Sequence, residues 1–240
     1  TRSPGDPSIK ALAKHGGARI AKPPDEGGRA FVMKVAEPTV ERLIQYYRLL
    51  IMMKEEGRKV VSSLQMGEML GIKASQVRKD LSYLGEIGKR GVGYHVNRLC
   101  THIENILASP RVWHVALAGV GNLGTALMGH AAFQSYKFSV EALFDVDPEK
   151  VGKKLMGVDC FHVDDIAKVM EERNIEVLIL AVPAAAAQSC VDKAAASPTL
   201  KGILAFTPAT VVVPDRILFY RVDIFVELEK LLFFLKEREK

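Results

Sequence analysis

A glycine-rich turn in the middle of the chain constrains the fold more than any other feature. It follows an apolar run at 112–118, precedes a helical stretch at 125–133, and consists of Gly119, Val120, Gly121, Asn122, Leu123 and Gly124. A second apolar run at 140–144 ends in Asp145. This order predicts a dinucleotide-binding βαβ unit, in which the glycines bring a pyrophosphate to a helix amino terminus and the acid binds ribose hydroxyls. Asp145 would repel a 2′-phosphate, so we expect NAD(H) rather than NADP(H).

The remaining C-terminal sequence extends this unit into a doubly wound parallel α/β sheet. Apolar strands are expected at 177–182 and 202–206, with helices near 164–173 and 184–196. Ligands of such sheets lie over the carboxyl ends of the strands. We therefore expect five further residues on the nicotinamide side of the site, namely Val182, Pro183, Phe206, Thr207 and Pro208.

The segment before this sheet has the pattern of a helix-turn-helix. A first amphipathic helix ends before Gly57, and its periodic apolar residues are Val40, Leu43, Ile44, Tyr47, Leu50 and Ile51. Ser62 and Gln65 are spaced as a capping box for a second helix, which ends at Gly71. A third helix is predicted at 74–84, with Val77, Leu81 and Leu84 on its apolar face. Two short helices joined by a glycine turn predict a DNA-reading module.

Polar and cationic residues follow this pattern in the order expected of a winged helix. Gln76 and Arg78 can hydrogen-bond to base edges, and Lys79 and the nearby serines can hold phosphates. A glycine-rich hairpin at 88–94 carries Lys89 and Arg90 as a wing. The predicted DNA-contacting residues are Ser62, Ser63, Ser75, Gln76, Arg78, Lys79, Ser82, Tyr83, Lys89, Arg90, Gly91 and Tyr94.

Net charge differs between the N-terminal and C-terminal parts of the chain. Net charge is +4 over residues 1–36, +4 over 37–98 and −3 over 99–240, as expected if one part of the molecule meets a polyanion. We predict a disordered basic tail at 1–36, a winged-helix domain at 37–98, a Rossmann domain at 99–224 and an apolar C-terminal helix at 225–240. No run of about 18 apolar residues suggests a membrane span, and three scattered cysteines suggest neither disulfides nor a metal site, so we expect a cytoplasmic protein.

Four sequence runs closely resemble the Rex family of redox-sensing transcriptional repressors. They are QVRKDLSY at 76–83, GKRGVGY at 88–94, GVGNLG at 119–124 and FDVDP at 144–148. The resemblance implies a homodimer that binds a pseudopalindromic operator and is released from DNA by NADH. It also implies exchange of the C-terminal helix between subunits. Finally, it implies a salt bridge between Arg48 and Asp223 in one of two states.

The chain departs from the family pattern on the cofactor side. His130 stands where a studied family type has a switch tyrosine, Ala184 and Ala185 replace a charged pair, and the sequence at 205–208 is Ala-Phe-Thr-Pro instead of Asn-Phe-Ala-Pro. Two alternatives therefore remain open beside an NADH sensor. One is a DNA-binding regulator whose Rossmann domain is vestigial or responds to another nucleotide ligand. The other is an NAD-dependent dehydrogenase with an appended DNA-binding domain, although no catalytic constellation is evident.

Overall fold

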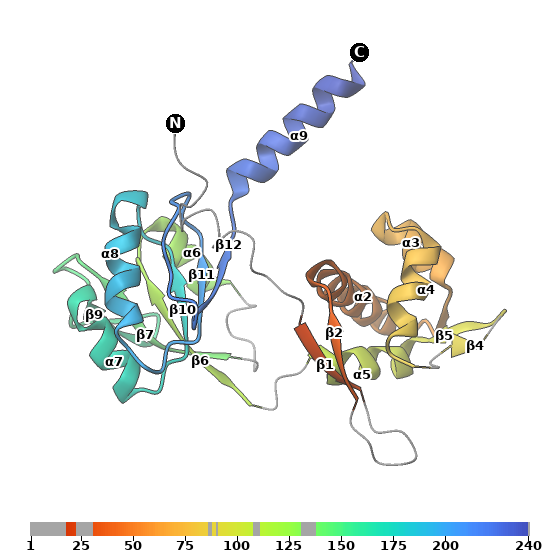
Figure 1. The fold of residues 1–240 in the computed structure, drawn as a ribbon, viewed down its shortest axis with the longest axis horizontal. Helices are drawn as coiled ribbons and strands as arrows, with labels where there is room; N and C mark the ends of the chain where they lie inside the picture. Colours follow the sequence, from red (N-terminus) through yellow and green to blue (C-terminus); the bar gives the residue numbers. More distant parts are fainter. Residues whose placement is uncertain are drawn as a thin grey trace. The chain divides into compact units, whose positions relative to one another are not determined.

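The structure is a computed structural model that describes residues 18–22, 31–85, 88–89, 91–107, 111–130 and 138–239. The described residues up to 107 form one compact unit, and those from 111 onward form another. Figure 1 shows helices around a small sheet in the first unit and a larger sheet in the second.

The first unit is a winged helix preceded by a hairpin. Strands β1 (Ala18–Lys22) and β2 (Phe31–Val35) pair antiparallel. The remaining elements are, in order, α2 (Glu37–Glu55), β3 (Val60–Val61), α3 (Ser63–Leu70), α4 (Ala74–Ser82), β4 (Gly88–Lys89), β5 (Gly93–His95) and α5 (Val96–Leu107). The three short strands form an antiparallel sheet in the order β3-β5-β4, whose β4-β5 part is the predicted wing.

Local signals in the sequence explain the helix-turn-helix. Both hydrogen bonds of the capping box between Ser62 and Gln65 are present, and Gly71 ends α3 with a left-handed φ of 67°. The predicted apolar face of α4 is buried, as expected. The predicted face of α2 is rotated, because Ile44 is exposed and the buried residues are Thr39, Leu43, Tyr46, Leu49, Leu50 and Met53.

Two predicted boundaries of the first unit need correction. Disorder was predicted throughout 1–36, which is wrong for β1 and β2, since runs such as Phe-Val-Met-Lys-Val favour strands. Residues 1–17 and 23–30 lie outside the described residues. The border expected after residue 98 falls inside α5, whose Leu99 and Ile103 pack into the same core as Leu43 of α2.

The second unit is a doubly wound sheet, as predicted. Its elements are, in order, β6 (Trp113–Ala118), α6 (Asn122–Gly129), β7 (Phe138–Asp145), β8 (Lys154–Leu155), β9 (Val158–His162), the 3₁₀ helix η2 (Val163–Asp165), α7 (Ile166–Glu172), β10 (Val177–Leu180), α8 (Ala184–Ala195), β11 (Gly202–Ala205), β12 (Leu218–Arg221) and α9 (Ile224–Arg238). The strand order is β12-β11-β10-β6-β7-β9-β8, parallel except for the β8-β9 pair. The order reverses between β6 and β10, where such sheets bind ligands.

Buried side chains fill both faces of this sheet. One cluster joins β6, β7, β10 and β11 to α7 and α8, and another lies on the side of α6. Helix α9 differs, because none of its residues is buried. Within the described ranges, no helix combines the length and apolar character needed to cross a bilayer.

Candidate nucleic-acid interface and nucleotide-binding site

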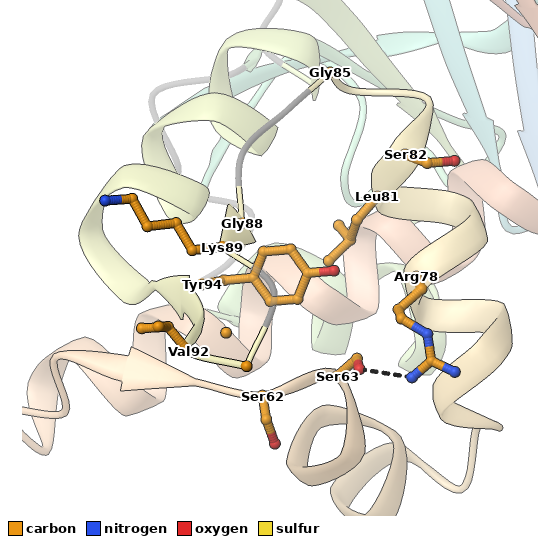
Figure 2. A pocket seen from close by; sticks show the side chains of 12 residues that line it. Ser62, Ser63, Arg78, Leu81, Ser82, Gly85, Gly88, Lys89, Val92 and Tyr94 are labelled. Atoms are coloured by element: carbon orange, nitrogen blue, oxygen red, sulfur yellow. Dashed lines mark hydrogen bonds between the residues drawn. The ribbon is translucent and has the colours of Figure 1, made fainter.

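A hollow of about 490 Å³ lies between the helix-turn-helix and the wing (Figure 2). It is lined by Ser62, Ser63, Arg78, Leu81, Ser82, Gly85, Gly88, Lys89, Gly91, Val92, Gly93 and Tyr94. Seven of these residues were predicted to contact DNA, so the fold brings much of the predicted set together. Arg90 was also predicted but lies outside the described residues.

Hydrogen bonds position the polar side chains around this hollow. Arg78 donates from Nη1 to Ser63 Oγ at 3.1 Å, linking α4 to the first residue of α3. The Ser82 hydroxyl donates to the Lys79 carbonyl at 2.7 Å, so its oxygen remains an acceptor. Ser75, Arg78 and Lys79 are exposed on α4, and Tyr83 is exposed just after it. This surface can offer cationic donors to phosphates and base edges.

The wing depends on two glycines that admit no side chain. A Cβ at Gly93, where φ is +98°, would lie 2.6 Å from the Val61 carbonyl oxygen, and one at Gly88 would lie 2.6 Å from Tyr94 Cε1. The Tyr94 ring extends from β5 toward α4 (Figure 2). Burial raises the pKa of Tyr94, with Arg78 acting in the opposite direction, so the phenol stays neutral and can donate.

A buried carboxylate that sequence reasoning missed lies behind this surface. Asp80 is 0% exposed and accepts hydrogen bonds from Arg42, at 2.6 Å and 2.8 Å, and from Tyr46 at 2.9 Å. It also accepts one from Gln76 Nε2 at 2.8 Å. The signal in the sequence was an acid on the apolar side of a basic helix, between Val77 and Leu81. Gln76, predicted to read bases, therefore has one donor engaged within the protein.

A second hollow, of about 590 Å³, lies at the reversal of strand order in the sheet. It is lined by Gly119, Gly121, Asn122, Leu123, Phe144, Asp145, Val146, Lys150, Val163, Ala181, Val182, Pro183, Ala186, Ser189, Cys190, Lys193 and Phe206. Eight of the predicted cofactor residues are among them. The contributions of η2 and α8 were not predicted, because nothing local marks Val163, Ser189 or Lys193 as facing a ligand.

The three glycines of the motif have separate physical roles. Gly119 has φ +92°, and a Cβ there would lie 2.4 Å from the Ala181 carbonyl oxygen. A Cβ at Gly124 would lie 2.0 Å from the Gly119 carbonyl oxygen, so α6 packs against the turn only because this residue is glycine. A Cβ at Gly121 would meet nothing within 4 Å. Gly121 therefore lines open space, the shape that a pyrophosphate needs to approach the backbone.

Asp145 is held tightly at the end of β7. Its Oδ2 accepts from the Val120 N–H at 2.9 Å and from Lys150 Nζ at 3.3 Å, while Oδ1 accepts from the N–H groups of Val146 and Asp147. Burial alone would raise the pKa of Asp145, but these hydrogen bonds lower it overall. Of these four donors, Lys150 is the most distant and is the one side chain; the other three are backbone N–H groups.

Two of the four predicted cofactor residues that do not line this hollow belong to the glycine turn. Val120 acts through its backbone N–H on Asp145, and Gly124 through its lack of a side chain. Thr207 is buried, and its Oγ1 accepts from the Ala209 N–H at 3.4 Å, while Pro208 is exposed. The side chain of Thr207 thus belongs to its own turn.

Comparison with known proteins matches both units. Residues 34–82 match a family described as putative DNA-binding protein N-terminus, and residues 111–209 match a CoA binding domain. A redox-sensing transcriptional repressor Rex from Geobacillus kaustophilus is 40% identical over 203 residues, covering 85% of this chain and 94% of the relative. The chain belongs to the Rex family of redox-sensing transcriptional repressors.

Solved structures agree with this membership. A crystal structure of RSP in complex with β-NAD⁺ and operator DNA has a TM-score of 0.78 and 29% identity, covering 86% of this chain and 95% of that one. A crystal structure of RSP in complex with β-NADH has a TM-score of 0.76 and 28% identity, covering 85% and 96%. The Rex fold therefore extends over both units.

The predicted switch residues of this Rex protein occupy three different settings. Arg48 is exposed on α2, and His130 is exposed at the carboxyl end of α6. Asp223 is the N-cap of α9, accepting from the N–H groups of Phe225 at 3.1 Å and Val226 at 3.3 Å. The pairing of Arg48 with Asp223 stays a prediction. In this chain Asp223 also has a structural role as a helix cap.

Helix α9 of this Rex protein exposes an unusually apolar surface. Phe225 is 72% exposed and Phe234 is 62% exposed, and exposed leucines lie along the same helix at Leu228, Leu231, Leu232 and Leu235. Large exposed apolar patches mark interaction surfaces.

Proposed function

We propose that this chain is a homodimeric repressor that binds operator DNA and is released from it when NADH occupies the Rossmann domain. The observation that carries the proposal is the presence in one chain of two shaped sites. One is the cationic hollow between α4 and the wing, and the other is the open cradle at Gly121. Family membership and the complexes of RSP with operator DNA, β-NAD⁺ and β-NADH support the same reading.

On the DNA side, α4 would enter the major groove and the wing would contact the backbone or the minor groove. Arg78 can pair with a guanine edge while Ser63 holds its guanidinium in place. Lys79 and Lys89 would contact phosphates. Since operator DNA and its protein share a two-fold axis, the two recognition helices must lie about 34 to 36 Å apart.

On the nucleotide side, Gly121 and the amino terminus of α6 would hold the pyrophosphate, with Asp145 at the ribose. NAD⁺ carries a positive charge on its nicotinamide ring that NADH lacks. The apolar residues Val182, Pro183 and Phe206 would disfavour that charge on the nicotinamide side. A tenfold preference for NADH needs only about 1.4 kcal/mol.

The two subunits would associate through α9, whose side chains are unburied in the single chain. We also place the pairing of Arg48 with Asp223 in this dimer, as one of the contacts that distinguish its two states. The protein would act in the cytoplasm, together with its DNA. All three cysteines are buried and unpaired, which suits a reducing compartment.

The experiment is a fluorescence anisotropy titration of a labelled pseudopalindromic duplex at one fixed salt concentration. NADH is expected to release the duplex at concentrations at which NAD⁺ and coenzyme A have little effect. The matched variant is Gly121→Val, whose Cβ meets no atom within 4 Å and whose methyl groups would occupy the cradle. It should bind DNA like the wild type and ignore NADH. The proposal would be contradicted if coenzyme A released the wild type from the duplex and NADH did not. It would also be contradicted if none of the three nucleotides caused release.

A further inference from the structure

The buried carboxylate beneath α4 controls how one polar side chain of that helix is presented. Asp80 Oδ1 accepts from Arg42 Nη2 and from Gln76 Nε2, both at 2.8 Å. Its Oδ2 accepts from Arg42 Nε and from the Tyr46 hydroxyl. Four donors thus surround a carboxylate that is 0% exposed, and Arg42 and Tyr46 fix its position from α2.

This carboxylate is ionised at neutral pH. Burial raises the pKa of Asp80, but hydrogen bonds from Arg42, Gln76 and Tyr46 together lower it below its ordinary value. An ionised carboxylate has no proton to donate and can only accept. The part of the Gln76 side chain that faces it must therefore be the NH₂ group, which assigns the oxygen and nitrogen of that amide from chemistry.

Gln76 is also well placed to meet DNA. It lies in the first turn of α4, half-buried, next to the exposed Ser75. Residues of this turn are those that reach base edges in helix-turn-helix proteins. Among the described residues, Gln76 Oε1 has no hydrogen-bond partner, so the orientation forced by Asp80 leaves a carbonyl oxygen as an unused acceptor.

We infer that Asp80 is a positioning residue that fixes the Gln76 amide so that Oε1 reads an exocyclic amine in the major groove. The amine is that of adenine N6 or cytosine N4, because guanine and thymine present only acceptors at the corresponding positions. This inference rests on the proposed function as a DNA-binding repressor. It predicts that one base pair in each half-site is selected through the amine it carries.

The first test deletes the amine from the DNA. Competition anisotropy first measures the affinity of the full chain for a set of duplexes. Each duplex carries one base-pair change, made symmetrically in both half-sites, and the set shows which base pair is selected. At that pair, adenine is then replaced by unsubstituted purine, or cytosine by pyrimidin-2-one. The wild type should lose about tenfold in affinity on the amine-free duplex, as for the loss of one base contact. Gln76→Ala should bind both duplexes equally.

The second test separates positioning from contact. In Asp80→Asn the amide at position 80 can offer either an oxygen or an NH₂ group. The Gln76 amide can then take either orientation, with Oε1 and Nε2 exchanged. This variant, confirmed as folded by its thermal melt, should lose selectivity at the same base pair as Gln76→Ala and at no other. The matched control Lys79→Ala should weaken binding to all duplexes alike and reduce the salt dependence.

Each result decides a specific statement. If Gln76→Ala keeps the wild-type preference at every base pair, or still distinguishes the amine-free duplex, the assignment of Gln76 as a reader is overturned. If Gln76→Ala loses the preference but folded Asp80→Asn keeps it, the positioning role of Asp80 is overturned. If the wild type shows no sequence preference at all, the proposed function itself fails, which distinguishes that failure from the other two.

Discussion

Replacing Glu176 by glutamine removes a single charge from the amino-terminal edge of the parallel sheet. The Glu176 side chain is 3% exposed and receives two hydrogen bonds from Arg111, both at 2.6 Å, and one from Lys201 at 2.5 Å. Hydrogen bonds from Arg111 come first among the causes that lower its pKa from 4.5 to about 2, with burial opposing them. The charged form is therefore strongly favoured in the folded state.

The size of the effect follows from proton linkage. A fall in pKa from 4.5 to about 2 corresponds to about 3 kcal/mol of stability at neutral pH. Arg111 and Lys201 are 44% and 59% exposed, so solvent screens the pair and we expect about 1 to 2 kcal/mol. Because the folded pKa is lowered, this stability is present above pH 4.5 and is lost as the pH falls toward about 2.

Urea unfolding followed by tryptophan fluorescence measures this directly. Trp113 is the single tryptophan of the chain, and the Arg111 guanidinium lies 4.3 Å from its ring centroid. Glu176→Gln should be less stable by about 1 to 2 kcal/mol at pH 7, and the difference should shrink at pH 3.5. The control Glu172→Gln alters an exposed pair with Lys168 and should change stability by less than about 0.5 kcal/mol. An equal deficit for Glu176→Gln at both pH values would refute the electrostatic explanation.

Two further predictions concern the glycine turn and α9. Gly124→Ala places a Cβ 2.0 Å from the Gly119 carbonyl oxygen. It should destabilise the second unit by about 2 kcal/mol or more, measured by the same urea unfolding. The control is Gly121→Ala, whose Cβ meets no atom within 4 Å, and equal stability of the two variants would contradict the packing role of Gly124. Phe225→Asp and Leu232→Asp charge the exposed surface of α9 and should convert a dimer into a monomer in sedimentation velocity, with a fall in operator affinity; unchanged dimers would remove α9 from the interface.

The features that sequence predicted well are those determined by neighbours along the chain. The capping box at Ser62, the left-handed turn at Gly71 and the glycine turn at 119–124 each need only a few consecutive residues. Their side chains and backbone angles follow from local stereochemistry, so their pattern can be recognised without tertiary structure.

The features that the sequence analysis did not predict depend on residues far apart in the chain. Asp80 meets Arg42 from 38 positions away and Tyr46 from 34, so its burial cannot be deduced from its own helix. The buried face of α2 differs from the predicted one for the same reason, since the buried Tyr46 donates its hydroxyl hydrogen to Asp80, which lies 34 positions away. The place of Lys193 in the lining of the nucleotide hollow likewise depends on how α8 packs against the sheet.

The separation of the two sites into different units limits how a nucleotide can control DNA binding. Of the residues that the structure describes, none lines both hollows, so the proposed switch needs a conformational equilibrium that both ligands bias. NADH can weaken DNA binding only by its difference in affinity between the DNA-binding and released states, and a hundredfold release requires about 2.7 kcal/mol. We expect the open cradle at Gly121 to supply binding, without a difference between the two states. The difference must therefore come from contacts that change between states, which is why a variant at Asp223, unlike Gly121→Val, should alter the extent of release more than the affinity for NADH.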